Sequence, residues 1–388
     1  MKISSLQENL KQGLTIVGHV AGRNINLPIL NNVMIEAKNG NIKLTTTNLE
    51  IGIVCVVRGK AETEGSFTVD AKTISDYISL LPNKKVSIEQ KENKLIIETE
   101  NYKTKIIGQS AEEFPLIPQV EKIFFYSADV NEFKRALAQV IFAVSGSESR
   151  IELAGVLFSF NKDALILAAT DSYRLAEKEL NIKTNSKDDT DKKVIIPART
   201  LHELLRILSG IQDGEGEKDE TNEIKFYLSE NQILFTIGST ELVSRLIEGQ
   251  YPDYKQIIPT EVKTKAIINR AELIRAVKAS ALFSKTGIND INLDLPAGKN
   301  KVVVSSASGQ TGENIAELEA EVDGEDNGVV INYKYLLDGL NNIESENVKI
   351  NIIDSNTPCI LKPSALAKAT ADKEKSDSYL YIIMPIKQ

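Results

Sequence analysis

Apolar residues recur at helical spacing in three stretches of the chain. Within each stretch they follow one another at intervals of three or four residues, which places them along one face of a helix. The three stripes are Leu6, Leu10, Leu14 and Val17, then Phe133, Leu137, Ile141 and Val144, and finally Leu273, Val277 and Ala281. The second stripe repeats the first 127 residues later. We therefore predict three copies of one repeat. The first repeat is predicted to have a helix that begins at the N-terminus itself.

Two strand-like segments follow each predicted helix. A short turn rich in Gly, Asn, Asp and Lys divides each pair, which predicts a β-hairpin. These hairpins occupy residues 31–57, 155–180 and 291–322. Alternating apolar and polar positions at this spacing suit sheets that bury one face.

A second helical pattern follows the hairpin in each repeat, over residues 69–81, 196–208 and 331–343. A basic residue stands at the same early position in all three, namely Lys72, Arg199 and Lys334. An apolar residue follows two places later in each, namely Ile74, Leu201 and Leu336. A solvated helix face explains any single lysine or arginine, but three in register favour a shared role.

The first two repeats end in stretches that contain proline, FPLIP at 114–118 and YPDYKQIIP at 251–259. Such stretches are typical of linkers between domains. We predict an α+β chain of three tandem repeated domains over residues 1–120, 121–258 and 259–388. Three polar segments, at 181–193, 212–223 and 366–378, are predicted to be long loops because their composition cannot support a packed core.

Composition places the chain among ordinary globular proteins. Of 388 residues, 42% are hydrophobic and 26% are charged, and the net charge is −8. A length of this size favours more than one core. No apolar run reaches the length of a membrane span, and the N-terminus lacks the apolar core of a signal peptide, so we expect a cytoplasmic protein that does not bind membranes.

The residues that carry common enzyme chemistry are scarce or isolated. His19 and His202 lack partners at metal-ligand spacing, and Cys55 and Cys359 lie in apolar segments typical of buried thiols. Asp171 is best explained as a turn residue. We expect no cofactor, no metal and no catalytic site. An enzyme with a carboxylate pair hidden in the fold, and a monomeric adaptor that binds peptides without surrounding DNA, remain as alternatives.

Several short motifs, in order along the whole chain, resemble the bacterial DNA sliding clamp, the β subunit of DNA polymerase III. They are Leu27-Pro28-Ile29-Leu30-Asn31-Asn32 after Arg23, Thr45-Thr46-Thr47-Asn48-Leu49-Glu50, Leu153-Ala154-Gly155-Val156-Leu157-Phe158 after Ser149-Arg150, Ala169-Thr170-Asp171-Ser172-Tyr173-Arg174-Leu175-Ala176, Tyr251-Pro252-Asp253-Tyr254, and Tyr381-Ile382-Ile383-Met384-Pro385-Ile386. Each motif alone is short, and their specificity comes from their order on a threefold repeat.

The resemblance implies a closed ring formed by a head-to-tail homodimer, with helices lining a central hole and β-sheets outside. It implies an accessory processivity factor for replication, without catalytic activity, that surrounds double-stranded DNA regardless of sequence. The polar helix faces would supply a mildly basic lining, with Lys11, Lys72, Lys134, Arg135, Arg199, Arg206, Arg275, Lys278 and Lys334. Weak phosphate contacts of this kind allow sliding. The resemblance adds Arg23 and Arg150, on loops at one rim, as DNA contacts.

The resemblance also implies a cleft in which partner proteins insert a short peptide. The polymerase α subunit, the clamp loader and other proteins with a clamp-binding motif would dock there. Carried over position by position, the cleft residues are Leu153, Thr170, Ser172, Tyr173, Arg174, Leu175, Pro252, Ile257, Ile382, Met384, Pro385 and Ile386. A flexible methionine among aliphatic side chains suits apolar peptide anchors. Core packing is the competing explanation for Leu153 and Leu175.

The remaining implied contact is the dimer interface, where Ile106 of one chain would meet Leu282 and Phe283 of the other. Ile106 is expected on an exposed strand edge, which a partner would cover. Two positions depart from the family. Ser172-Tyr173 stands where many members have Gly-His or Gly-Tyr, and Gln256 stands where some have arginine. We expect these departures to reshape the cleft slightly and to remove one charge.

Overall fold

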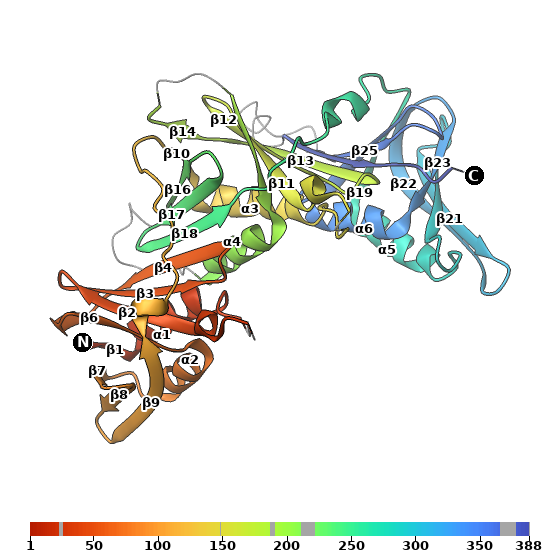
Figure 1. The fold of residues 1–388 in the computed structure, drawn as a ribbon. Helices are drawn as coiled ribbons and strands as arrows, with labels where there is room; N and C mark the ends of the chain where they lie inside the picture. Colours follow the sequence, from red (N-terminus) through yellow and green to blue (C-terminus); the bar gives the residue numbers. More distant parts are fainter. Residues whose placement is uncertain (23–25, 148, 187–190, 211–221, 365–377, 388) are drawn as a thin grey trace. The chain divides into compact units, whose positions relative to one another are not determined.

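The computed structural model of the chain describes residues 1–22, 26–147, 149–186, 191–210, 222–364 and 378–387. These residues form two compact units (Figure 1). Unit 1 comprises Met1–Lys134, Ile182–Asp189 and Arg199–Leu246, and unit 2 comprises Arg135–Asn181, Thr190–Ala198 and Ile247–Gln388.

The order of elements repeats three times: a strand, a helix, a group of strands, a second helix and three closing strands. The first repeat contains β1 (Lys2–Leu6), α1 (Gln7–Gly18), β2 (Asn32–Lys38), β3 (Asn41–Thr47), β4 (Ile51–Val57), β5 (Lys60–Thr63), β6 (Gly65–Asp70), α2 (Ala71–Leu80), β7 (Lys85–Lys91), β8 (Lys94–Thr99) and β9 (Tyr102–Ser110). A short 3-10 helix, η1 (Pro28–Asn31), precedes β2, and another, η2 (Ala111–Glu113), follows β9.

The second and third repeats follow the same plan. The second contains β10 (Tyr126–Asp129), α3 (Val130–Ile141), η3 (Ile151–Leu153), β11 (Gly155–Phe160), β12 (Ala164–Thr170), β13 (Arg174–Asn181), β14 (Lys183–Thr184), β15 (Lys192–Pro197), α4 (Ala198–Gly210), β16 (Glu223–Leu228), β17 (Gln232–Ile237), β18 (Thr240–Arg245) and η4 (Tyr254–Ile257). The third contains β19 (Thr264–Asn269), α5 (Arg270–Ala281), β20 (Asp290–Leu295), β21 (Lys301–Ser308), β22 (Gly312–Gly324), β23 (Asn327–Asn332), α6 (Tyr333–Asn342), β24 (Asn347–Ile352), β25 (Cys359–Ser364) and β26 (Tyr379–Ile383).

Each unit is built on one antiparallel sheet that joins strands of two repeats. In the described residues, unit 1 has the order β14-β10-β16-β17-β18-β4-β3-β2-β6-β9-β8-β7-β1-β5, and unit 2 has the order β15-β11-β12-β13-β26-β25-β24-β19-β22-β21-β20-β23. The strands of the second repeat are therefore divided between the units. They join their neighbours through the pairs β18–β4 in unit 1 and β13–β26 in unit 2.

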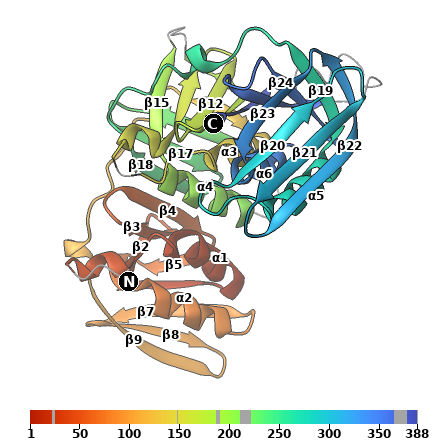
Figure 2. The same ribbon diagram turned by 90° about the vertical axis from the view of Figure 1, so that its right-hand side faces the viewer.

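The predicted apolar stripes face the sheets. In unit 1, α1 packs against β3 and β4 beside α2, and Leu10, Leu14 and Val17 are buried. In unit 2, α5 packs against β21 and β22 beside α6, and Figure 2 shows both helices on one side of these strands. Burial of one helix face against a sheet leaves the opposite face polar and exposed.

The recurring basic position of the second helices is confirmed. Lys72, Arg199 and Lys334 are each the second residue of their helix, and all three are exposed. The apolar residues two places later are fully buried at Ile74, Leu201 and Leu336. Their shared position thus follows from the orientation of each helix on its sheet.

The prediction for the N-terminus was wrong, because the first helix does not begin there. Lys2–Leu6 is the strand β1, which pairs with both β7 and β5, and the helix starts at Gln7. Ile3 is fully buried, while Leu6 is 46% exposed and lies outside the stripe. Pairing on both sides outweighs local helical preference. Strands likewise precede α3 and α5, at β10 and β19.

The predicted polar loops have mixed outcomes. The segment 181–193 is not wholly loop, because β13 ends at Asn181, β14 covers Lys183–Thr184 and β15 begins at Lys192. Residues 212–221 and 366–377 lie outside the described residues.

Arg206 has a structural function that its place on a polar helix face did not reveal. Its guanidinium donates to the carbonyls of Thr15 and Ile16 in the last turn of α1, at 2.9 Å and 2.6 Å. It also pairs with the buried carboxylate of Glu203, which lies 2.8 Å from Nδ1 of His19. A cation at a helix C-terminus satisfies free carbonyls and compensates the helix dipole. Arg206 is therefore committed to joining α4 to α1.

One turn occurs twice, in equivalent places of the first and second repeats. Thr47 Oγ1 donates to the carbonyl four residues later at 2.9 Å and accepts from the amide two residues later at 3.0 Å. Thr170 Oγ1 makes the same two bonds at 2.6 Å and 3.1 Å. The third residue of each turn has a positive φ, 76° at Leu49 and 78° at Ser172. The repeat thus extends to individual hydrogen bonds.

The residue after each threonine caps the same turn. Asn48 Oδ1 accepts from the amides two and three residues later, at 3.0 Å and 2.8 Å. Asp171 Oδ1 does so at 2.9 Å and 3.0 Å. Asn and Asp favour such turns because their short side chains bond to nearby backbone amides. The prediction that Asp171 is a turn residue is confirmed.

We expect Thr47→Val and Thr170→Val to lower the free energy of unfolding by about 1–2 kcal/mol each, because each removes two hydrogen bonds of a buried hydroxyl. The two losses should agree within about 0.5 kcal/mol, since the bonds are equivalent. Urea denaturation measures both, with Thr47→Ser and Thr170→Ser as controls that keep the hydroxyl. Losses that differ by several-fold would contradict the equivalence of the turns.

Candidate functional site

The turn at Thr170–Arg174 holds a charged side chain that has several partners in unit 2. Arg174 begins β13, and its Nε donates to Asp171 Oδ2 at 3.0 Å. Nη2 donates to the Phe142 carbonyl at 3.0 Å, and Nη1 pairs with the carboxylate of Asp338 on α6. The Arg174 side chain is only 12% exposed, whereas that of Asp338 is 47% exposed. Two carboxylates thus face one arginine, so its charge is fully compensated.

Aromatic rings enclose the same guanidinium. Its central carbon lies 4.7 Å from the centre of the Tyr335 ring and 5.5 Å from that of Phe142. Tyr173, which is 63% exposed, stacks on Tyr335 at 6.4 Å with an interplanar angle of 20°. Arginine between aromatic faces gains cation–π attraction as well as packing. We call Phe142, Tyr173, Arg174, Tyr335 and Asp338 the Arg174 cluster.

Three members of this cluster were missed from the sequence: Phe142, Tyr335 and Asp338. Tyr335 and Asp338 are three residues apart on α6, which places them on one helix face. That spacing was a usable signal, but nothing in the sequence connected this face with Arg174. Phe142 contributes a backbone carbonyl as well as its ring, and a carbonyl carries no sequence signature.

The C-terminal tail lies beside the cluster. β26 pairs with β13 so that Ile383 is opposite Arg174, and the Met384 amide donates to the Tyr173 carbonyl at 2.8 Å. The Ile386 amide then donates to the Val330 carbonyl at 2.8 Å. Met384, Pro385 and Ile386 are half-buried. The structure therefore brings the predicted tail residues and the predicted turn together in unit 2.

The stretch around η4, at the end of the second repeat, packs against this sheet. Tyr251 accepts a hydrogen bond from the Thr170 amide at 3.1 Å, and Tyr254 donates to Glu177 at 2.5 Å. Burial raises the pKa of both phenols, and for Tyr254 the Glu177 carboxylate raises the pKa further. Both hydroxyls thus stay protonated at neutral pH and act as structural anchors.

Several predicted cleft residues are core residues in the chain by itself. Thr170 is 6% exposed, Leu153 is 1% exposed, and Leu175 and Ile382 are fully buried. Leu175 and Ile382 share a cluster with Tyr254, with Tyr251 packed against it. The accessible members are Ser172, Tyr173 and Ile257, while Pro252 is half-buried like the tail. Gln256, which stands where some family members have arginine, donates to Asp253 at 2.9 Å.

The predicted DNA-contact residues have different surroundings. Lys72, Arg199 and Lys334 are exposed at the starts of their helices. Arg150 is turned toward the Thr170–Arg174 turn, where its Nη1 donates to Ser172 Oγ at 3.0 Å and its Nε donates to Glu152 at 3.1 Å. Arg23 lies outside the described residues.

The expected exposure of Ile106 was wrong. Its side chain is only 9% exposed, because this face of β9 turns inward, and the next residue, Ile107, is 71% exposed instead. A shift of one residue reverses the face in a strand. Leu282 is 72% exposed and Phe283 is half-buried, and their contact with a second copy stays a prediction.

The described residues contain no group of three or more His, Cys, Asp and Glu side chains that could hold a metal ion. Both cysteines are free and buried. Burial raises the pKa of Cys55 and raises that of Cys359 to about 12, so neither thiol is a ready nucleophile at neutral pH. No helix in the described part of the chain is both long and apolar enough to cross a membrane.

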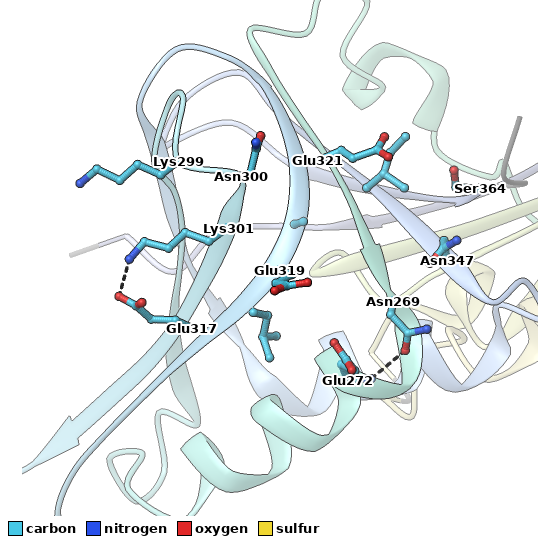
Figure 3. Close-up of a pocket in the computed structure, with 13 residues that line it drawn as sticks. Asn269, Glu272, Lys299, Asn300, Lys301, Glu317, Glu319, Glu321, Asn347 and Ser364 are labelled. Atoms are coloured by element: carbon cyan, nitrogen blue, oxygen red, sulfur yellow. Dashed lines mark hydrogen bonds and ion pairs between the residues drawn. The ribbon is translucent and has the colours of Figure 1, made fainter.

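A separate hollow of about 950 Å³ lies in the third repeat, between β19, β22 and the start of α5 (Figure 3). It is lined by Ile267, Asn269, Glu272, Lys299, Asn300, Lys301, Glu317, Leu318, Glu319, Ala320, Glu321, Asn347 and Ser364. Lys301 pairs with Glu317 at 2.5 Å, and Asn269 caps α5 through the Glu272 amide at 3.1 Å. These contacts stabilise the strand pair and the helix start.

Family models match all three repeats. The N-terminal, central and C-terminal domains of the DNA polymerase III beta subunit match residues 1–118, 127–253 and 255–375. The beta sliding clamps of Staphylococcus epidermidis and Staphylococcus aureus are each 31% identical over 371 residues, which cover 93% of this chain and 92% of theirs.

Solved structures agree with these matches. The beta subunit of Pseudomonas aeruginosa, at 27% identity, superposes with a TM-score of 0.89 over all of both chains. The Bacillus subtilis sliding clamp, at 26% identity, gives 0.88 over all of this chain and 99% of that one. The P. aeruginosa clamp has also been solved bound to griselimycin, with 26% identity, a TM-score of 0.88 and full coverage of both chains. Repeated α+β domains, matched sequence and matched fold together show that this chain belongs to the DNA polymerase III beta subunit family, the bacterial sliding clamps.

Proposed function

We propose that two copies of this chain close head to tail into a ring that surrounds duplex DNA and tethers replication proteins to it. The three domains would span residues 1–120, 121–258 and 259–388. The ring would act in the cytoplasm as an accessory factor of DNA polymerase III, without catalysis of its own. The observation that carries this proposal is a pair of open strand edges with opposite charge, one in each unit.

The first open edge belongs to β9. Its residues Tyr102–Ile107 pair with β8 on one side, whereas β6 pairs only from Gly108 onward. In the described residues, the other side of Tyr102–Ile107 therefore has no partner strand. Lys103, Lys105 and Ile107 alternate on the exposed face of this segment. An unpaired edge of this kind is a template for another strand.

The second open edge belongs to β22. Residues Gly312–Glu319 pair with β21, while β19 pairs only with Ala320–Gly324. The far side of Gly312–Glu319 thus has no partner strand within the described residues. Ile315, Glu317 and Glu319 alternate on its exposed face, and Ile315 is 65% exposed. This edge repeats the pattern of β9 with acidic residues in place of lysines.

An antiparallel pairing of the two edges has one register that suits every side chain. With Ile107 opposite Ile315 of a second copy, Lys105 meets Glu317 and Lys103 meets Glu319. This register covers two exposed isoleucines and places opposite charges side by side, which stabilises cross-strand neighbours. Leu282 and Phe283, in the same unit as β22, would be covered by the same partner. Two such contacts related by twofold symmetry close a ring.

Reversing the basic edge should open the ring. We expect Lys103→Glu with Lys105→Glu to weaken the dimer at least about tenfold, because like charges then face each other at the interface. Adding Glu317→Lys with Glu319→Lys should restore it. Sedimentation velocity measures the dimer, and Lys38→Glu with Lys60→Glu controls for the change in net charge. A quadruple variant that stays monomeric would contradict the proposed register.

Basic helix starts support a loose hold on DNA. Lys72, Arg199 and Lys334 are exposed at equivalent positions, so six such residues would face the duplex in a dimer of three-repeat chains. The net charge of −8 disfavours tight binding by the whole surface. Scattered phosphate contacts without base contacts give affinity that does not depend on sequence.

A ring held by topology should stay on circular DNA after loading and leave when that DNA is linearised. We expect the retained fraction to fall to background within minutes of a single cut, because sliding off an end breaks no specific contact. Gel filtration of labelled protein on circular and cut plasmid measures the retained fraction. Equal retention on both forms would rule out encirclement.

Partner peptides would dock on the Arg174 cluster and the tail beside it. Tyr173, Met384 and Ile386 offer accessible apolar surface around a guanidinium whose charge is already compensated, which suits apolar anchors more than charged ones. The adjacent residues Leu175 and Ile382 belong to a buried apolar cluster together with Tyr254. We expect griselimycin, which is bound to the P. aeruginosa clamp, to compete for this site.

Removing the tail should abolish docking without opening the ring. We expect deletion of residues 384–388 to weaken binding of a fluorescein-labelled peptide with two leucines and one phenylalanine at least about tenfold, because truncating a central anchor costs more than about 1.4 kcal/mol. Deletion of residues 387–388 is the matched control and should bind normally. Fluorescence anisotropy, with griselimycin as competitor, measures binding. Loss of the dimer in sedimentation would show instead that the tail is structural.

A further inference from the structure

The end of α1 carries a histidine whose two ring nitrogens have different surroundings. His19 directly follows α1, and its Nδ1 lies 2.8 Å from Oε2 of Glu203 on α4. Because a carboxylate only accepts hydrogen bonds, Nδ1 is the donor. The His19 side chain is 69% exposed, whereas that of Glu203 is 6% exposed. Among the described residues Nε2 has no hydrogen-bond partner, so this nitrogen is open to another group.

Arg206 already neutralises the Glu203 carboxylate. Its Nε donates to Oε1 of Glu203 at 3.0 Å, while the rest of its guanidinium holds carbonyls at the end of α1. The group of Glu203, Arg206 and a neutral His19 therefore has no net charge. α2 and β3 approach the same end of α1 with the hydroxyls of Ser75 and Thr46, which do not titrate. Protonation of His19 would thus give this exposed site one net positive charge.

The other two repeats show that the helix end does not require a histidine. α1, α3 and α5 each have 12 residues, and the residues that follow them are His19, Phe142 and Leu282. Glu203 and Asp338 are likewise the sixth residues of α4 and α6, and Asp338 pairs with an arginine alone. Apolar side chains therefore serve at the histidine position in two repeats. The imidazole of the first repeat is an addition to the shared plan, which points to a role in binding.

His19 lies beside the proposed DNA-contact residues of unit 1. Glu203, which holds its ring, is four residues after Arg199 on α4, so the two lie on one side of that helix. Arg199 is exposed and is one of the recurring basic residues that we propose to face the duplex. In the sequence, Arg23 follows His19 by four residues. A phosphate at this surface would therefore meet the open Nε2 of His19.

We propose that His19 is a DNA-phosphate contact that forms only when its imidazole is protonated. The inference rests on the proposed function, because it needs a duplex at the polar helix faces. In the neutral ring Nε2 presents a lone pair, which repels a phosphate oxygen. Once Nε2 takes one proton from water, it donates to the phosphate while Nδ1 stays on Glu203. Because histidine changes charge near neutral pH, DNA binding and proton uptake are then linked.

Duplex affinity at two pH values tests this inference. A fluorescein-labelled short duplex is titrated with the full chain at low salt, at about pH 6 and about pH 8, which lie on either side of the ordinary pKa of histidine. Fluorescence anisotropy measures binding. We expect the natural chain to bind about threefold more tightly at the lower pH, as gain of one exposed charge-assisted hydrogen bond implies. His19→Asn should remove this difference, because its amide can still donate to Glu203 but takes up no proton.

Two further variants separate a charge effect from a structural one. His19→Arg supplies a permanent cation, so it should bind at both pH values about as tightly as the natural chain does at the lower one. His202→Asn is the matched control, because His202 is the only other histidine and is exposed on α4. It should keep the threefold difference.

A pH dependence that persists in either His19 variant, or that disappears in His202→Asn, would overturn the inference. So would a natural chain that binds the duplex equally at both pH values, and each of these results leaves the encirclement of DNA in place. A natural chain that does not bind the duplex at either pH would overturn the proposed DNA contacts, and this inference with them.

Discussion

The antiparallel pairing of β13 with β26 is the interaction on which the rest of unit 2 depends. It joins the second repeat to the third in one sheet and sets Ile383 opposite Arg174. The same pairing delivers Met384 to the Tyr173 carbonyl and leaves the tail beside the Arg174 cluster. Without this register the turn, the tail and the aromatic residue Tyr335 would have no reason to meet.

Unit 1 contains a copy of that arrangement with other side chains. β4 pairs with β18 in the same register, and the turn at Thr47 has the same hydrogen bonds as the turn at Thr170. Ile51 stands where Arg174 stands, so no guanidinium gathers rings and carboxylates there. The fold therefore supplies the same backbone twice, and a few substitutions on it distinguish the copy that we propose as a docking site.

Neutralisation of arginine side chains by nearby carboxylates affects both proposed activities, peptide docking and the encirclement of DNA. Arg174 is neutralised by two carboxylates, and Arg206 is committed to the end of α1 and to Glu203. A basic residue in the sequence is therefore not automatically available to DNA. The residues that stay exposed, such as Lys72 and Lys334 at their helix starts, would suit the proposed loose hold on DNA.

Apolar spacing in the sequence alone determined the three repeats, the helix faces and the shared position of Lys72, Arg199 and Lys334, because local periodicity reflects burial directly. The motif that contains Thr170 and Asp171 likewise determined its turn, since those side chains bond to their own backbone. Tertiary structure alone decided that Lys2–Leu6 is a strand, that Ile107 and not Ile106 is exposed, and that Phe142, Tyr335 and Asp338 surround Arg174. These outcomes depend on pairing between residues far apart in the chain, and a residue's own neighbours carry no record of that pairing.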